Sequence, residues 1–167
     1  LIAKTGLRFA EALGVTPADF AFHHQTLRVS KTWNYKSPDG GFAPTKNASS
    51  NRLVRLDWML CMQMKQLCEG QSQEEPLFVK EGERVFNATV NDRLAALCRK
   101  NEIPVISVHG LRHTHASLLL YAGVSVASVA KRLGHSNMTT TQTTYLHIIK
   151  ELESQDNDKV MQFLSTL

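Results

Sequence analysis

The sequence HGLRHTHAS, residues 109–117, places three histidines and one arginine within nine positions. His109 and His113 are four residues apart, the spacing at which a helix presents two ligands to a zinc ion. Arg112 lies between them, and its planar guanidinium group suits the oxygens of a phosphate. The two interpretations lead to different enzymes, so the rest of the chain has to decide between them.

A metal site at this stretch is disfavoured by the residues around the histidines. A hydrolytic zinc helix normally carries a glutamate directly after its first histidine, whereas Gly110 follows His109 here. The positive charge of Arg112 would also repel a metal cation. We therefore expect a site for an anion, with no metal ion and no cofactor.

The composition fits one domain with its own core. The chain has 167 residues, 43% of them hydrophobic, and 19 Lys plus Arg against 15 Asp plus Glu give a net charge of +4. This charge permits a polyanionic partner without requiring one. No apolar run approaches the roughly 20 residues that cross a bilayer, and no secretory leader opens the chain. Cys61, Cys68 and Cys98 form no Cys-x-x-Cys pair, so we expect a cytoplasmic protein without disulfides.

The first 14 residues, LIAKTGLRFAEALG, have apolar residues at helical spacings and end at Gly14. This pattern predicts a single helix with Arg8 and Glu11 on one side. Because the chain begins inside this helix, at Leu1, we expect the sequence to be a piece of a longer protein.

Short strands are predicted next, from alternation over TLRVSKTWNYK (residues 26–36) and RLVRL (residues 52–56). By composition alone, the charged side chains of this region are expected on a sheet face that is exposed to solvent. These residues are Lys31, Lys36, Lys46, Arg52 and Arg55. A helix is then predicted over residues 58–70, with Met59, Met62 and Leu67 in the core.

Helices are predicted for most of the second half of the chain. Their ranges are 87–100, 108–122, 126–133 and a segment from Thr139 or Thr140 through Tyr145 to Leu152. Ser125 is the expected cap of the third of these helices, and Gly134 is its expected stop. Residues 158–167, DKVMQFLSTL, predict a further short amphipathic helix. No part of the chain is an obvious partner for its apolar face.

Five pieces of the sequence occur in a specific order. They are TGLRFAE (residues 5–11), PTKNASSNR (44–52), HGLRHTHA (109–116), LGHS (133–136) and Tyr145, ten residues after His135. This ordered set resembles the catalytic domain of the tyrosine recombinases, the phage and conjugative-transposon integrases, over nearly the whole chain. The resemblance implies a mainly α domain with a small antiparallel β-sheet (α+β). It also implies that N-terminal DNA-binding domains precede this C-terminal catalytic domain.

The resemblance also implies roles for individual residues. Arg8 and Arg112 would clamp the non-bridging oxygens of the scissile phosphate, and His109 and His135 would hydrogen-bond to it. Tyr145 would be the nucleophile that forms a 3′-phosphotyrosyl link. Phosphoryl transfer asks a protein mainly to position groups and neutralise charge, which these cations can do in place of a metal ion.

Further residues are expected around this set. Lys46 would protonate the leaving 5′ oxygen, with Lys31 and Lys36 as alternatives, and Glu11 would brace the site. A phenol of pKa ~10 has to be activated by a base or by nearby cations. His109 is the candidate base for Tyr145.

His113 and His115 are interpreted as structural residues. His113 is expected to pack or to bond to the backbone. His115 is expected to face solvent or to support the site. Neither belongs to a position to which the resemblance assigns chemistry.

The expected activity is site-specific DNA recombination and integration for a phage or mobile element, without metal or ATP. No P-loop is present in the sequence, and a transesterase needs none. The expected partners are double-stranded DNA attachment sites, on which the protein forms a homotetramer, with the isolated fragment a monomer. Residues 158–167 are expected to dock on a neighbouring protomer. The expected location is the bacterial cytoplasm, in association with the nucleoid.

Other functions remain open at this stage. AGVSVASVAKRLGHS, residues 122–136, resembles a helix-turn-helix, so a DNA-binding regulator without catalysis is the main alternative. A regulator has no need for Arg8, Lys46 and Tyr145 in these contexts. An inactive recombinase domain is disfavoured because no expected residue is missing, and a type IB topoisomerase is disfavoured by the compact spacing between HGLRHTHAS and Tyr145.

Overall fold

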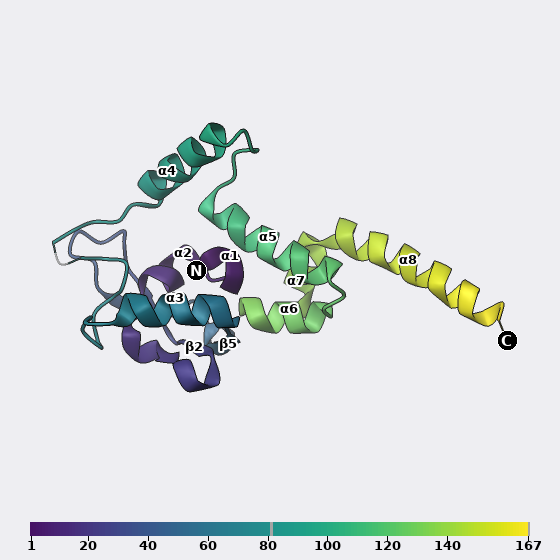
Figure 1. Ribbon diagram of the computed structural model, residues 1–167, viewed down its shortest axis with the longest axis horizontal. Coiled ribbons are helices and arrows are strands. Elements are labelled where there is room, and N and C mark those ends of the chain that lie inside the picture. Colours follow the sequence, from purple (N-terminus) through teal and green to yellow (C-terminus); the bar gives the residue numbers. More distant parts are fainter. Residues whose placement is uncertain (81, 167) are drawn as a thin grey trace.

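The protein is mainly helical, with two small antiparallel sheets in its first third (Figure 1). The computed structural model describes residues 1–80 and 82–166, except the side chains of residues 150, 151, 153–155, 158 and 159. The helices are α1 (Ile2–Thr5), α2 (Phe9–Leu13), α3 (Trp58–Cys68), α4 (Asn87–Lys100), α5 (Val108–Tyr121), α6 (Val126–Leu133), α7 (Met138–Thr144) and α8 (Leu146–Leu164). The strands are β1 (Phe20–Ala21), β2 (Thr26–Val29), β3 (Lys31–Trp33), β4 (Phe42–Pro44) and β5 (Arg52–Arg55). Single-turn 3₁₀ helices cover Pro17–Asp19, Phe22–His24 and Ala48–Ser50.

The predicted single helix over residues 1–14 is wrong, because the chain breaks at Gly6. Gly6 has φ 69°, a left-handed conformation, and the backbone is extended at Arg8 before α2 begins. A Cβ atom on Gly6 would lie 2.7 Å from Leu133 Cδ2 and 2.8 Å from His115 Cδ2. The glycine therefore lets this segment pass against α5 and α6.

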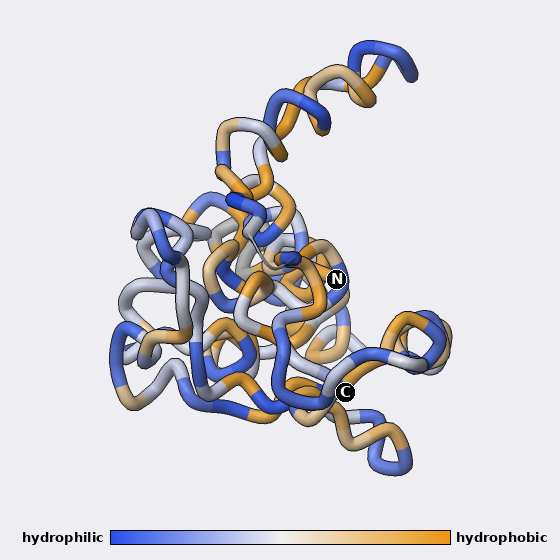
Figure 2. Tube along the Cα trace, turned by 90° about the vertical axis from the view of Figure 1, so that its left-hand side faces the viewer, coloured by the Kyte–Doolittle hydropathy of each residue, from blue (hydrophilic) through white to orange (hydrophobic). Residues whose placement is uncertain are grey.

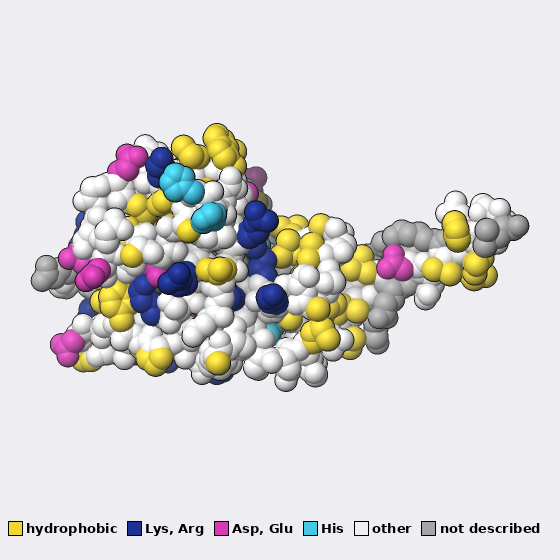
Figure 3. All heavy atoms as spheres, turned by 90° about the horizontal axis from the view of Figure 1, so that it is seen from below, with side chains coloured by type: hydrophobic (Ala, Val, Ile, Leu, Met, Phe, Trp, Pro, Cys, Tyr) yellow, Lys and Arg dark blue, Asp and Glu magenta, His cyan; other side chains and the backbone are white. Residues whose placement is uncertain are grey.

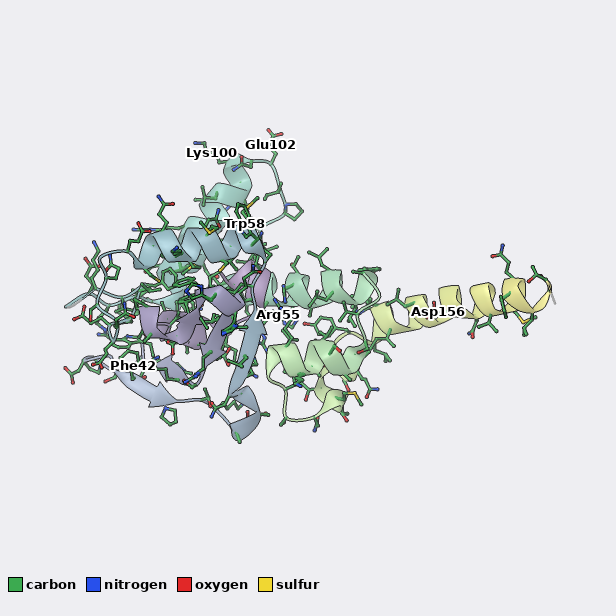
Figure 4. The ribbon with its side chains drawn as sticks, turned by 60° about the horizontal axis from the view of Figure 1, so that its bottom comes forward. Phe42, Arg55, Trp58, Lys100, Glu102 and Asp156 are labelled. Atoms are coloured by element: carbon green, nitrogen blue, oxygen red, sulfur yellow. The ribbon has the colours of Figure 1, made fainter. Side chains whose placement is uncertain are left out.

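The first hydrophobic core, called here the N-terminal core, lies between the three-stranded sheet and α3. Strand order is β1-β2-β5, and the register pairs Leu27 with Val54, so that both side chains point into the core. The other strands, β3 and β4, form a separate hairpin. Figure 4 labels Phe42 on this hairpin and Arg55 at the end of β5. The cluster consists of Leu7, Ala12, Val15, Phe20, Leu27, Val29, Val54, Leu56, Leu60, Cys61, Met64 and Cys68.

The predicted core face of α3 is wrong. Met59, Met62 and Leu67 are 58%, 46% and 43% exposed. Leu60, Cys61, Met64 and Cys68 are buried against the sheet instead. Apolar residues lie nearly all round this helix, and Trp58, labelled in Figure 4 at its beginning, is also exposed.

The second hydrophobic core, called here the C-terminal core, lies among α5, α6, α7 and α8. It contains Ala116, Leu120, Val129, Leu133, Tyr145 and Ile148. Side chains of Ser107, Ser125 and Asn137 cap α5, α6 and α7 by accepting backbone N–H groups. The predicted helices over 108–122 and 126–133 are confirmed. The helix predicted from residue 139 is interrupted at Tyr145, which lies between α7 and α8.

Two helices extend beyond these cores. The first residues of α8 pack in the C-terminal core through Ile148, and the rest of this helix projects from the body in Figure 1. Helix α4 stands above the body in Figures 1 and 2, with apolar and polar residues along its length. The separate helix predicted over residues 158–167 is wrong, because α8 runs without a break to Leu164; Leu167 lies outside the described residues. In the described part of the chain, no helix combines the length and the apolar character needed to span a membrane.

Candidate active site

A cavity of about 180 Å³ lies where α2, α5 and α7 meet. It is lined by Arg8, His109, Arg112, His113, His135, Thr140, Thr144 and Tyr145. Five of the residues that the sequence predicted are thus brought together from distant segments. A larger hollow of about 560 Å³, between the turn after β3 and residues 75–80 and 82–85, contains none of them.

Arg112 is held in place by backbone carbonyl groups. It lies on α5, is 4% exposed, and donates through Nη1 to the Gly6 carbonyl and through Nη2 to the Leu133 carbonyl at 2.8 Å. Burial, followed by the charge of Arg8, lowers the pKa of Arg112 to about 10, so it stays charged at neutral pH. Neutral acceptors thus orient the guanidinium group without cancelling its charge.

Arg8 approaches the cavity from the N-cap position of α2. Its Nη1 donates to Glu11 Oε1 at 2.8 Å, and its Nη2 donates to the Gly134 carbonyl at 3.2 Å. Arg8 and Arg112 are therefore each held by the carbonyl of a left-handed glycine, Gly134 and Gly6 respectively.

Glu11 connects Arg8 to Arg52. Arg52 Nη2 and Nη1 donate to the Glu11 carboxylate at 2.9 and 3.2 Å, and the two side chains are 6% and 1% exposed. Burial opposes ionisation of Glu11, but the bonds from Arg52 and Arg8 outweigh it and lower its pKa. The predicted solvated position of Arg52 is wrong. The sequence held a signal, because Arg52 shares a strand face with Val54, a core residue.

His135 follows Gly134 and contacts Arg112. Its Nε2 lies 3.2 Å from Arg112 Nη2 and its Nδ1 lies 2.7 Å from the Thr141 hydroxyl. Burial and the charges of Arg112 and Arg8 lower the pKa of His135 to about 4, so the ring is neutral at neutral pH. It therefore accepts from Arg112 through Nε2 and donates to Thr141 through Nδ1.

Tyr145 is buried, and its hydroxyl contacts His113. Tyr145 is 3% exposed, and His113 Nδ1 lies 2.9 Å from its hydroxyl oxygen. Burial raises the pKa of Tyr145, while the charge of Arg112 opposes this rise. The rings of His109 and His113 meet edge to face, with centroids 4.6 Å apart.

Sequence reasoning missed this contact of His113, for which it expected packing or a backbone bond. The available signal was spacing, because His113 lies one helical turn after His109 and on the same face. Burial, followed by the charges of His109 and Arg112, lowers the pKa of His113.

His115 supports the segment that leads to Arg8. It is 7% exposed, so the prediction that it faces solvent is wrong, and the alternative of a supporting role fits its contacts. Its Nδ1 bonds to the Ala3 carbonyl at 3.0 Å, and its Nε2 accepts from Arg132 Nε at 2.9 Å. Burial, followed by the charge of Arg132, lowers the pKa of His115 to about 4.

None of the three candidate lysines lines the cavity. Lys31 donates to Asp19 and Thr16. Lys36 lies in the turn of the β3–β4 hairpin, and Lys46 is exposed just after β4. Within the described residues, no three His, Cys, Asp or Glu side chains gather closely enough to hold a metal ion.

Comparison with known sequences identifies the family of the chain. Residues 1–151 match the model of the phage integrase family. An integrase of Staphylococcus phage L54a is 26% identical, over 95% of this chain and 49% of its own length. The tyrosine recombinase XerC of Rickettsia bellii is 31% identical, over 92% of this chain and 47% of its own length. The chain thus spans about half the length of the curated relatives it matches.

Comparison with solved structures supports the fold. The Tn1549 transposon integrase, in complex with circular intermediate DNA, matches with a TM-score of 0.71 and 21% identity, over 85% of this chain and 52% of that one. The XerA recombinase matches with a TM-score of 0.67 and 21% identity, over 93% of this chain and 53% of that one. The predicted mainly α fold with small antiparallel sheets is confirmed. Since the family model covers residues 1–151, this chain belongs to the phage integrase family.

Proposed function

We propose that this chain is the catalytic domain of a site-specific tyrosine recombinase that cuts and rejoins DNA through Tyr145. The observation that carries the proposal is the cavity in which Arg8, Arg112 and the Tyr145 hydroxyl converge. Arg8 and Arg52 form ion pairs with the single carboxylate of Glu11, and Arg112 adds a third positive charge nearby, which leaves an excess of positive charge. A phosphodiester is an anion that fits this excess.

Arg8 and Arg112 stabilise charge on the non-bridging oxygens in this mechanism. Each guanidinium group carries more N–H groups than its observed contacts use, so donors remain for the phosphate. The carbonyl groups of Gly6, Leu133 and Gly134 orient both groups before DNA arrives. We expect Arg8→Ala or Arg112→Ala to slow cleavage by roughly 10²- to 10³-fold, as for other donors to a developing negative charge.

His109 and His135 complete the phosphate site, and Glu11 positions Arg8. His135 reaches the phosphate in its other neutral tautomer, in which Nδ1 accepts from the Thr141 hydroxyl and the hydrogen on Nε2 is donated to a phosphate oxygen in place of the contact with Arg112. Glu11 acts through Arg8 and Arg52, which it holds together, and we assign it a positioning role.

Lys46 protonates the leaving 5′ oxygen in this proposal. Lys31 is the weaker candidate because its ammonium group is already bonded to Asp19. Lys46 is exposed at the end of β4, outside the cavity, so the hairpin has to bring it to the bound DNA. A substrate with sulfur in place of the bridging 5′ oxygen needs no proton on its leaving group. Lys46→Ala should therefore cleave this substrate at the wild-type rate while failing on normal DNA, whereas Lys36→Ala should cleave both.

The partners follow from the same proposal. The substrates are double-stranded attachment sites of a phage or mobile element, bound by four copies of the protein in the bacterial cytoplasm at the nucleoid. DNA-binding domains that precede this one belong to the same proposal, and the relatives are about twice as long as the part that matches this chain. Lys and Arg side chains gather on the face of the body shown in Figure 3, which supports binding of a polyanion.

A covalent capture experiment tests the reaction. The whole protein that carries this chain is mixed, in EDTA, with a nicked attachment-site duplex whose short 5′ fragment escapes after cleavage. Wild type should form a protein–DNA adduct, and Tyr145→Phe should form none. A regulator that only binds DNA gives no adduct with either protein, and that result would sink the proposal.

A further inference from the structure

We propose that His113 accepts the proton of the Tyr145 hydroxyl when the tyrosine attacks DNA. This inference rests on the proposed function and adds a catalytic residue to it. The sequence favoured His109 for this task, but the hydrogen bond to the hydroxyl belongs to His113, at 2.9 Å from Nδ1.

The geometry suits a direct proton transfer. A general base has to lie within hydrogen-bond reach of the proton that it removes, and His113 already does so without DNA. Tyr145 is 3% exposed and packed in the C-terminal core, which keeps bulk water from serving as the acceptor. Both residues line the same cavity as Arg8 and Arg112, so the phenolate would form next to the phosphate.

The surroundings of His113 keep its acceptor nitrogen available. Burial, followed by the charges of His109 and Arg112 on α5, lowers the pKa of His113 from its ordinary value of 6.5, which favours the neutral ring at neutral pH. Its other titratable neighbours are His135 and Tyr145. In the tautomer with hydrogen on Nε2, the Nδ1 lone pair faces the hydroxyl.

The transfer balances with the groups already assigned. The O–H bond of Tyr145 breaks and its proton moves to His113 Nδ1, while the phenolic oxygen bonds to phosphorus. The bond from phosphorus to the 5′ oxygen breaks, and Lys46 protonates that oxygen. Religation runs in reverse, with His113 returning the proton to the departing tyrosine oxygen.

The test uses the covalent capture experiment with two substitutions at His113. His113→Ala removes the acceptor. His113→Asn places an amide oxygen, which accepts hydrogen bonds but is not basic, near the position of Nδ1. General base catalysis is typically worth ~10²- to 10⁴-fold, so we expect both variants to form adduct at least about 100-fold more slowly. His147→Ala is the matched control, because His147 is an exposed histidine outside the cavity and should leave the rate unchanged.

A more acidic nucleophile separates catalysis from positioning. With 3,5-difluorotyrosine at position 145, the phenol ionises more readily and depends less on a base. The deficit of His113→Ala should then shrink by about tenfold or more. DNA affinity and unfolding midpoints of the variants should stay close to wild type. If His113→Ala is too unstable, His113→Asn serves in its place.

Three results would overturn the assignment of His113. They are a wild-type rate for His113→Ala, a wild-type rate for His113→Asn, and a deficit that is equal for tyrosine and difluorotyrosine. Failure of the proposed function looks different, because then the wild-type protein forms no adduct or Tyr145→Phe forms one.

Discussion

Glu11 is the side chain on which the guanidinium groups of Arg8 and Arg52 meet. Removing one partner from a buried ionic group typically costs about 3–5 kcal/mol, because the remaining charges are left buried without compensation. We therefore expect Glu11→Ala to lower the free energy of unfolding by about 3 kcal/mol or more in denaturant titrations.

An exposed ion pair provides the control for Glu11. Lys4 and Asp57 have side chains that are 48% and 46% exposed, so Lys4→Ala should cost no more than about 1 kcal/mol. Equal losses of unfolding free energy in Glu11→Ala and Lys4→Ala would show that Glu11 does not stabilise the two arginines.

His115 makes stability depend on pH. Its pKa falls from 6.5 to about 4 on folding, so the unfolded chain takes up a proton in that interval before the folded chain does. Above pH 6.5 the neutral His115 therefore costs no stability, and the free energy of unfolding decreases as the pH falls from 6.5 toward 4. His135 acts in the same interval, so His115→Gln should remove part of this pH dependence. Unfolding measured at pH 7 and about pH 4.5 checks this, and exposed His147→Gln should retain the wild-type difference.

At the scale of elements, the turn at Gly6 determines how α1 and α2 meet α5 and α6. An alanine there has both a strained backbone and a Cβ within 2.8 Å of Leu133 and His115. Gly123 also has a positive φ, 79°, but a Cβ there meets nothing within 4 Å. Gly123→Ala should therefore cost only the backbone strain, about 1 kcal/mol, and Gly6→Ala should cost clearly more.

The same pair of substitutions should differ in activity. Gly6→Ala moves the carbonyl that orients Arg112, so the rate of adduct formation should fall for Gly6→Ala and not for Gly123→Ala. Parallel losses of stability and activity in the two variants would contradict this account of the turn.

The elements predicted best from the sequence are those with strong end signals. Ser125 and Gly134 bound α6 as expected, because a cap and a stop act locally. The break at Gly6 was missed because Leu7 and the residues after it continue a helical pattern. Only packing against Leu133 and His115 selects the turn.

Tertiary contacts also explain what sequence reasoning missed at the site. The motifs identified the arginines and Tyr145, and the structure gathers them in one cavity. Which apolar stripe of α3 faces the sheet, and which histidine of α5 reaches Tyr145, depends on how each helix is rotated in the fold. Spacing along one helix does not contain that information, so Met59 and His113 were both misplaced.

At the scale of the whole molecule, the projecting end of α8 carries apolar side chains that neither core covers. Val160, Met161, Phe163 and Leu164 are more than half exposed there. Figure 3 shows hydrophobic side chains on this projecting end. We propose that this end docks on a neighbouring protomer in the DNA-bound assembly. Deleting residues 158–167 should abolish tetramer formation on DNA, measured by light scattering, while the monomer keeps its unfolding midpoint. Unchanged assembly would refute the docking role.

Each of the two arginines is oriented by a glycine carbonyl group from a distant part of the chain. Gly6, next to the N-terminal core, orients Arg112, and Gly134, next to the C-terminal core, orients Arg8. A chain in which only one core has formed therefore presents a loosely held guanidinium and no finished anion site. Under the proposed function, the chain therefore gains the ability to cleave DNA only after both cores have folded. A copy that is partly folded, or that has lost one core by proteolysis, should not cleave DNA.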